Sequence, residues 1–513
     1  MPAAEPGVRP AGSIPRLAGG DVVAGISVAL VLIPQSLAYA SLAGVPAHLG
    51  LYASILPPIA AALFASSPYL QTGPTAMTSL LTLGSLSVIA PIGSDEYVAL
   101  AVLLAFVVGI ARLAIGLVRA GVVAHFLSQP VMLGFTTGAG LLIVGSQLPT
   151  ALGVNAPVDD VLGSALWSVG HPAVWQPAAL ALSVLTILLV LGGRRLHPLF
   201  PGVLVAVLVG IAYSRVAGYQ GPMIGEVPRG LPHLPGALPW SRLAGLLVPG
   251  GVIALVGFAE PASIARTLAA QDRRPWDPNR EFVSQGVANL VAGLSGGFPV
   301  GASFSRSFAN QLAGARTRWS GAITGLVVLL FLPLAGILQS LPRAVLSAIV
   351  ITSVLKLVQL GPLARLYRYT RFQAYVAWAT FGLTLALAPR VDYAVVAGVG
   401  MAVGLHLWRE LRVQVRTRFS DGTLHLEPIG VLFFASAPDL DETLIRELAL
   451  HPDADRLILD LEQLGRVDYT GAVALKTVAE HAATAGLTVE FVGIPPQARS
   501  LLTRVLGSML RGE

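Results

Sequence analysis

The chain has 513 residues, of which 54% are hydrophobic and only 12% are charged, and its mean hydropathy is +0.72. Soluble proteins carry about 25% charged residues, and a soluble core could not absorb this much apolar surface. Stretches of about 20 apolar residues are what a bilayer requires, so the composition predicts an integral protein of the lipid bilayer. The formal charge of +6 does not indicate nucleic acid as a partner, because the arginines are spread over short loops, where they set topology.

Cysteine is absent from the sequence, which excludes disulfides, thiolate metal sites and cysteine nucleophiles. The sequence also shows no metal-binding cluster and no nucleophile paired with a base, so we expect no metal, no cofactor and no enzymatic activity. Residues 1–20 form a polar lead rich in proline and glycine, without the pattern of a cleavable signal peptide. The first apolar segment is therefore expected to stay in the mature protein.

Apolar runs separated by proline, glycine and charge predict fourteen membrane segments. They start near residues 21, 48, 74, 96, 128, 175, 200, 245, 281, 303, 318, 343, 372 and 390. The third segment (74–89) and the tenth (303–312) are too short to span as ordinary helices, and both follow a short stretch with glycine and proline. We predict that they are broken helices that meet extended backbone inside the protein.

The distribution of arginine and lysine predicts an even number of crossings with both termini cytoplasmic, because cytoplasmic loops are enriched in these residues. The expected location is the plasma membrane. With both termini inside, the expected inner loops hold sixteen basic residues and the outer loops hold five. The inner residues are Arg9, Arg16, Arg112, Arg119, Arg194, Arg195, Arg266, Arg273, Arg274, Arg280, Arg316, Arg318, Lys356, Arg365, Arg368 and Arg371. The outer residues are Arg215, Arg229, Arg242, Arg343 and Arg390.

The two halves of the membrane region have the same layout, with seven segments on each side of a connector. Seven is odd, which places the halves in opposite orientation, as in the inverted repeats of many secondary transporters. The two short helices would then point their N-termini at each other near the midplane. The predicted parts are a cytoplasmic lead, a first repeat, a connector, a second repeat and a soluble domain, at 1–20, 21–218, 219–244, 245–411 and 412–513.

The first short helix has features of an anion site. Residues 71–78 indicate a strand that leads into a helix, with Pro74 at the first helical position and Thr75 after it. The N-terminus of a helix offers free N–H groups and a partial positive charge. We therefore expect Thr75 to contact the substrate.

The second short helix repeats this arrangement and adds charge. Residues 297–307 bring the hydroxyls of Ser303 and Ser305 and the full positive charge of Arg306 to a helix N-terminus. Together the two helices would bind an anion without a metal. The alternative for Arg306 is a snorkelling side chain at the membrane edge, although arginine in a membrane segment usually marks function.

Three more polar side chains interrupt apolar segments. Gln35 and Tyr39 follow Pro34 in the first segment and, four residues apart, share a helix face. They predict substrate contacts or, alternatively, hydrogen bonds between helices. Glu260 has no charged residue for many positions before it, and ionised and unpaired it would be costly there. It is expected either to bind a proton, as a coupling residue, or to pair with an arginine such as Arg306.

Together these motifs resemble the sulfate permease family of anion transporters, which includes prestin. The motifs are Pro-Gln-Ser-Leu-Ala-Tyr-Ala at 34–40, Gly-Leu-Tyr-Ala-Ser at 50–54, Thr-Gly-Pro-Thr at 72–75, Gly-Phe-Ala-Glu at 257–260 and Ser-Phe-Ser-Arg-Ser at 303–307. The resemblance covers nearly the whole chain and implies an α-helical membrane protein of seven plus seven inverted segments, as in the nucleobase permeases, followed by a small cytoplasmic α/β STAS domain. Segments one to four and eight to eleven would form a core, and the other six a gate.

The resemblance also implies the site and its function. The family's substrate residues carry over to Gln35, Tyr39, Thr75, Ser305 and Arg306, and its coupling carboxylate carries over to Glu260. At Pro261 relatives more often have serine, and the proline would kink the helix. The implied function is secondary active transport of a small anion (sulfate, bicarbonate or a dicarboxylate such as fumarate) by proton-coupled symport with alternating access, in a homodimer. The alternatives are an uncoupled anion exchanger or channel-like pathway, and a membrane sensor whose STAS domain signals to a partner.

After residue 411 the sequence has the character of a soluble α/β domain, which resembles a STAS domain and could contact a cytoplasmic protein. The expected strands and helices alternate at 423–434, 439–449, 456–461, 471–485 and 488–492, with a final helix after them. Tyr469 and Thr470 stand where soluble relatives have a phosphorylated serine. The alternative is that Asp468 and Thr470 only cap the following helix.

Overall fold

The structure is a computed structural model that describes residues 16–125, 128–197, 200–228, 230, 236–410, 414–433 and 436–510. Most of the N-terminal lead (1–20), parts of the connector (219–244) with Arg229, and Phe434 at the end of an expected strand lie outside the described residues. The chain divides into two compact units, Met1–Val399 and Gly400–Glu513, and each is described by itself.

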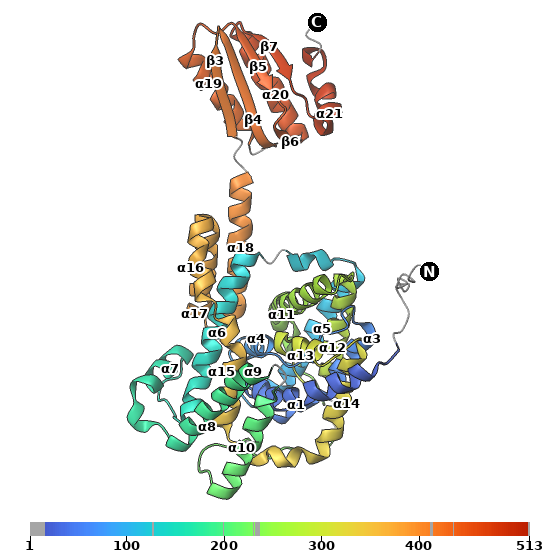
Figure 1. Ribbon diagram of the computed structural model, residues 1–513. Coiled ribbons are helices and arrows are strands. Elements are labelled where there is room, and N and C mark those ends of the chain that lie inside the picture. Colours follow the sequence, from blue (N-terminus) through green and yellow to red (C-terminus); the bar gives the residue numbers. More distant parts are fainter. Residues whose placement is uncertain are drawn as a thin grey trace. The chain divides into compact units, whose positions relative to one another are not determined.

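The first unit is built of helices (Figure 1). Before the connector they are α1 Gly19–Leu42, α2 His48–Tyr52, α3 Leu56–Phe64, α4 Ala76–Leu86, α5 Asp95–Leu117, α6 Gln129–Leu152, α7 Val161–Gly170, α8 Pro177–Ile187, α9 Gly193–Leu196 and α10 Gly202–Ala217. After it they are α11 Leu243–Gln271, α12 Pro278–Leu294, α13 Phe304–Leu312, α14 Trp319–Phe331, α15 Arg343–Val354, α16 Leu360–Tyr369, α17 Arg371–Ala386 and α18 Val391–Glu410. A helix begins close to each of the fourteen expected starts. Among the described residues, seven helical spans are long and apolar enough to cross a membrane.

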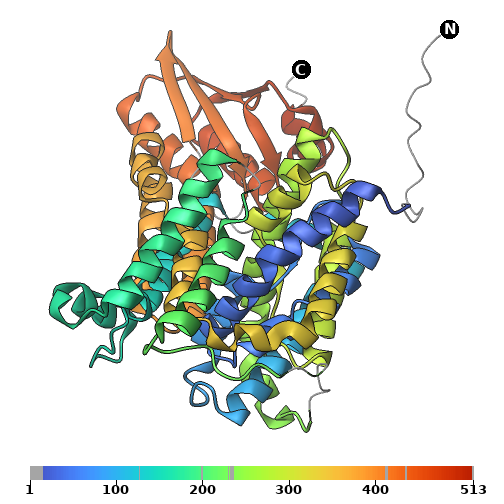
Figure 2. The same cartoon turned by 60° about the horizontal axis from the view of Figure 1, so that its bottom comes forward.

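The helices of the first unit pack as two groups. In the core group, α5 packs on α11 and α12, α3 on α12 and α14, and α1 on α13 and α14. In the gate group, α6 packs on α15 and α17, and α8 on α15. The groups meet where α1 contacts α10 and α15 and where α4 contacts α6 and α15; Figure 2 shows α1, in dark blue, among helices of both groups. The helices of the first group belong to expected core segments, and those of the second group to expected gate segments.

A pair of two-residue strands joins the halves of the chain inside the core group. Strand β1 (Thr72–Gly73) pairs antiparallel with β2 (Gly301–Ala302). β1 leads into the short helix α4 and β2 into the short helix α13. The expectation of extended backbone before two short helices is therefore confirmed. Pro74 was wrongly placed in the helix: it precedes Thr75, which is the N-cap because its side chain accepts a hydrogen bond from the Thr78 N–H.

Arg112 was wrongly placed in an inner loop. It lies within α5 and is completely buried. Its guanidinium donates hydrogen bonds to three backbone carbonyls. These acceptors offset the cost of burying a charge, which an arginine without hydrogen-bond partners would bear in full.

The second unit is a sheet with helices (Figure 1). Its elements are β3 Gln414–Ser420, β4 Thr423–Leu432, α19 Ala437–Leu450, β5 Arg456–Asp460, β6 Leu464–Val467, α20 Tyr469–Thr484, β7 Thr488–Val492 and α21 Pro496–Leu506. The strand order is β3-β4-β5-β7, with β6 beside β4. β3 runs antiparallel to β4, and the other pairs are parallel. The predicted strands and helices are present, while β3 and β6 were not predicted. Asp468 caps α20 by accepting the Gly471 N–H at 2.6 Å, and Thr470 lies inside the helix.

Candidate anion site between two short helices

The start of α4 is held by hydroxyl groups. Thr75 has extended backbone angles and is buried. Its Oγ1 accepts the Thr78 N–H at 3.3 Å and lies 3.0 Å from Thr78 Oγ1. A Cβ placed on Gly301 would lie 3.6 Å from Thr75 Cγ2. Thr75 therefore borders the strand pair from the α4 side, with its hydroxyl already engaged in capping.

The start of α13 has two hydroxyls that do not cap it. Ser303 is the N-cap by backbone geometry but makes no side-chain cap hydrogen bond. Its Oγ lies 3.2 Å from Ser305 Oγ. Ser307, one turn on, accepts the Gln71 N–H at 3.0 Å. Ser303 and Ser305 thus face each other at the N-terminus of α13, while Ser307 fixes the helix to the segment before β1.

Arg306 is a buried guanidinium without a hydrogen-bond partner. Its exposed fraction is 1%, and its Nε, Nη1 and Nη2 all have no hydrogen-bond partner. A Cβ placed on Gly73 would lie 3.7 Å from Arg306 Nη2, so the charged group reaches the strand on the opposite half of the chain. Buried polar groups are otherwise nearly always satisfied, and an unpaired buried charge is very costly. A buried guanidinium with three such donors is therefore a candidate binding group for an anion.

Glu260 lies at the same helix N-terminus. Its Oε1 accepts the Phe304 N–H, the first of α13, at 3.2 Å, and the side chain is half-buried. It makes no hydrogen bond with Arg306, whose guanidinium nitrogens have no hydrogen-bond partner. The structure therefore does not show the arginine pair that was the alternative for Glu260. α11 continues through Pro261, so that proline does not end the helix.

Gln35 and Tyr39 connect the core group to the gate group. The Gln35 Nε2 donates to Ser353 Oγ on α15 at 3.4 Å, while its Oε1 has no partner. The buried Tyr39 hydroxyl interacts with the same serine and lies near Arg306 and Glu260. The interhelical hydrogen bond that was the alternative for Gln35 is thus present, and one acceptor remains free beside it. Ser353 was not predicted, although a hydroxyl in the apolar run 349–354 was a signal.

The structure thus brings all seven predicted residues to one region of the core group. Gln35, Tyr39, Thr75, Glu260, Ser303, Ser305 and Arg306 come from α1, α11, α13 and the segments beside the strand pair. Besides Ser353, three residues that support the site were missed. Gln285 Nε2 donates to Thr72 Oγ1 at 2.9 Å, and Asn289 exchanges two hydrogen bonds with the Val300 backbone at 3.1 and 2.9 Å. Arg112 is the third.

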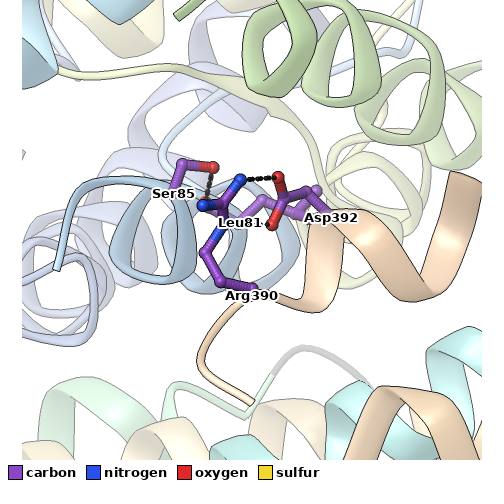
Figure 3. A network of polar contacts seen from close by, with 4 residues as sticks. All are labelled: Leu81, Ser85, Arg390 and Asp392. Atoms are coloured by element: carbon purple, nitrogen blue, oxygen red, sulfur yellow. Dashed lines mark hydrogen bonds and ion pairs between the residues drawn. The ribbon is translucent and has the colours of Figure 1, made fainter. Parts of the chain in front are cut away.

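The far end of α4 meets the gate group. A Cβ on Gly84 would lie 2.1 Å from the Pro389 carbonyl oxygen, so only glycine allows this approach. Arg390 then pairs with the buried Asp392 at 3.0 Å. Figure 3 shows Arg390 turned toward the last turns of α4, where Ser85 Oγ donates to the Leu81 carbonyl at 2.7 Å. The two ends of α4 therefore contact the candidate site and the gate group.

Comparison with protein families gives two matches. The sequence profile of the Sulfate permease family matches residues 19–380, and that of the STAS domain matches residues 414–506. A probable sulfate transporter of Mycobacterium tuberculosis is 36% identical over 397 residues, which cover 75% of this chain and 69% of the relative. The sodium-independent sulfate anion transporter of Bos taurus is 30% identical and covers 96% of this chain and 86% of the relative.

Two solved structures share the fold. The murine Solute Carrier 26 family member A9 anion transporter, in the inward-facing state, aligns with a TM-score of 0.88 and 21% identity, over 96% of this chain and 88% of that one. The transmembrane domain of a cyanobacterium bicarbonate transporter, BicA, aligns with a TM-score of 0.62 and 24% identity, over 75% of this chain and 97% of that one.

Proposed function

Because the chain belongs to the sulfate permease family, we propose that it is a secondary active transporter of a small anion. The relatives' names favour sulfate, and bicarbonate or a dicarboxylate such as fumarate are the other candidate substrates. The observation that carries the proposal is Arg306, whose buried guanidinium has no hydrogen-bond partner. An anion there would accept charge-assisted hydrogen bonds, which are among the strongest in proteins.

In this proposal the anion binds between the starts of α4 and α13. Arg306 would supply the charge, and the hydroxyls of Ser303, Ser305 and Tyr39, with the Gln35 amide, would supply hydrogen bonds. Thr75 would shape the pocket from the α4 side, since its own hydroxyl caps that helix. Partial positive charge at both helix N-termini adds to the attraction.

Proton coupling would follow from the place of Glu260. As a carboxylate it accepts the first N–H of α13, a donor that the anion could otherwise use. Protonation removes its negative charge, and so removes a repulsion of the incoming anion and weakens its hold on the Phe304 N–H. Binding of the proton and of the anion would therefore favour each other, as symport requires.

Transport would occur by movement of the core group against the gate group. The Gln35 to Ser353 hydrogen bond and the close contact of Gly84 with Pro389 both join these groups, so both would change as the site opens to one side and then the other.

The antiparallel pairing of β1 with β2 supports two inverted repeats of seven segments, 21–218 and 245–411, joined by 219–244. We propose cytoplasmic termini, a homodimer, and a regulatory STAS domain at 412–513 open to a protein partner.

An uncoupled exchanger or channel-like pathway is the second candidate. It is favoured by the hydrogen bond between Glu260 and the Phe304 N–H, since an ionised carboxylate could hold that position permanently. Glu260 would then be structural, and the anion would cross without a proton.

The test is uptake of labelled sulfate, bicarbonate and fumarate by proteoliposomes at two pH values. Symport predicts faster uptake with acid outside, and no current when one monovalent anion moves with one proton. Current driven by an anion gradient alone, with uptake independent of the pH difference, would establish the second candidate instead. Absence of uptake of every anion would contradict both.

A further inference from the structure

A second guanidinium, which is not one of the seven candidate site residues, is buried in the core group. Arg112 on α5 is 0% exposed and, with Arg306, heads the largest fully buried side chains among the described residues. Its Nε donates to the Ala254 carbonyl at 3.1 Å, its Nη2 to the Ile253 carbonyl at 3.1 Å and its Nη1 to the Val300 carbonyl at 2.9 Å. All three acceptors are neutral, and the described residues include no carboxylate within ion-pair distance of it. Arg112 thus keeps its full positive charge inside the protein.

Arg112 lies close to both elements that form the anion site. Ile253 and Ala254 belong to α11, two turns before Glu260, and Val300 directly precedes β2. A Cβ placed on Gly257 would lie 2.6 Å from Arg112 Nη2 and 3.3 Å from Thr78 Cγ2. The guanidinium is therefore a near neighbour of the first turn of α4, behind the strand pair.

We propose that Arg112 is a specificity-determining residue, a fixed charge that favours a doubly charged anion over a singly charged one. The inference rests on the proposed anion site. The Coulomb energy between Arg112 and the anion scales with the anion's charge and is weakly screened in a buried region. Arg306 can bond to either kind of anion directly, whereas Arg112 does not reach it and acts through its field alone. Loss of the field therefore weakens a dianion twice as much, in free energy, as a monoanion.

A purely structural role would behave differently. Three hydrogen bonds to α11 and to the residue before β2 also fix the positions of Glu260 and α13. If this positioning were the only role of Arg112, loss of these hydrogen bonds would weaken the binding of sulfate and of bicarbonate by the same factor. The ratio of the sulfate and bicarbonate affinities therefore distinguishes an electrostatic role of Arg112 from a purely structural one.

The experiment measures the KM for labelled sulfate and the inhibition constant of bicarbonate in proteoliposomes at one pH. Arg112→Gln removes the charge and keeps two N–H donors; we expect the sulfate KM to rise about tenfold and the bicarbonate constant about threefold. Arg112→Lys keeps a positive charge in the region, and the ratio of the two constants is expected to change much less than in Arg112→Gln. An equal change of both constants in Arg112→Gln, or the same change of ratio in Arg112→Lys, would overturn the inference.

A glycine pair provides the second test in case Arg112→Gln does not fold. Gly257→Ala pushes a methyl group against Arg112 Nη2, whereas a Cβ on Gly251 of the same helix meets nothing within 4 Å. Since this methyl group displaces the guanidinium and so weakens its field at the site without removing the charge, Gly257→Ala is expected to shift the affinity ratio in the same direction as Arg112→Gln but by a smaller factor, and Gly251→Ala to leave it unchanged. A wild-type chain that carries no anion would overturn the proposed function and this inference together. Loss of uptake in Arg306→Ala would support the proposed function. If the ratio of the sulfate and bicarbonate affinities in Gly257→Ala were then the same as in the wild type, only the present inference would be overturned.

Discussion

Arg306 and Glu260 lie at the same helix N-terminus, but only Glu260 has a hydrogen-bond partner. The carboxylate has a backbone donor, while the guanidinium has no acceptor. A residue kept in an unfavourable state by the fold is expected to lower stability and to serve function. Substitutions at these two positions should therefore separate the two effects.

Arg306→Ala should abolish transport without destabilising the protein. Loss of the charge-assisted hydrogen bonds to the anion is expected to reduce uptake of labelled anion about a hundredfold. Since removal of an unpaired buried charge relieves a cost, the unfolding temperature in detergent without substrate should stay the same or rise. Arg316→Ala, on an exposed side chain close to the end of α13, is the control. Wild-type uptake in Arg306→Ala would exclude it from the anion site.

Glu260→Gln should uncouple the anion from the proton. The amide oxygen can still accept the Phe304 N–H, but the side chain takes up no proton. Anion exchange is expected to persist, while proton influx driven by an anion gradient, followed with a pH-sensitive dye inside the vesicles, should fall to background. Glu281→Gln is the control, because Glu281 is buried but accepts the Ser66 and Ser67 N–H groups in a structural role. If Glu260→Gln still moved protons with the anion, the coupling role would be wrong.

Among the secondary-structure elements, α4 joins the site to the boundary between core and gate. Its first turn borders the strand pair, and Gly84 near its last turn meets the Pro389 carbonyl. An element in contact with both regions can transmit movement of one to the other without any change of its own shape. The contact at Gly84 is therefore a place to test whether core and gate separate during transport.

Gly84→Ala should hinder the approach of α4 to the gate. Its methyl group would lie 2.1 Å from the Pro389 oxygen, and overpacking of this kind costs about 1–3 kcal/mol. We expect uptake to slow and a label at Ser87, the C-cap of α4, to react faster. Ser87→Cys supplies a single labelling site because the chain has no cysteine. Gly382→Ala in α17 of the gate, where a Cβ meets nothing within 4 Å, is the control. Unchanged uptake and labelling in Gly84→Ala would show that the contact between Gly84 and Pro389 does not break and re-form during the transport cycle.

The sequence predicted the elements that local chemistry determines. Thr75 and Ser303 are residue types that begin helices, and glycine and proline before them interrupt apolar runs, so both short helices were found. Long-range partners were not visible. Arg112 reaches carbonyls 141 to 188 positions away, and Gln35 reaches Ser353 over 318 positions. No periodicity encodes such pairs, so Arg112 was read as a loop cation and Ser353 was missed.

For the whole molecule, the two units have separate hydrophobic cores. Leucines of β4, β5, α19, α20 and α21 form a buried cluster without residues of the first unit. The isolated segment 412–513 is therefore expected to fold cooperatively on its own. In it, Asp468→Ala should lower the free energy of unfolding by about 1 kcal/mol, since it removes the cap of α20. Urea unfolding measures this, with Asp453→Ala in an exposed turn as control. An equal loss in both variants would contradict the capping role.

Removal of residues 412–513 should leave the transport reaction intact. All seven residues of the candidate site lie in the first unit, whose own core includes residues of α1, α5, α11 and α15. The sulfate KM of the truncated chain is therefore expected to stay within about twofold of the full chain, because no binding group is lost. The maximal rate is free to change, since a regulatory domain acts on the balance between states. The measurement is uptake per reconstituted protein, with Arg306→Ala in the truncated chain as the background. A truncated chain that remains monodisperse but takes up no anion would show that the STAS domain is part of the transport machinery.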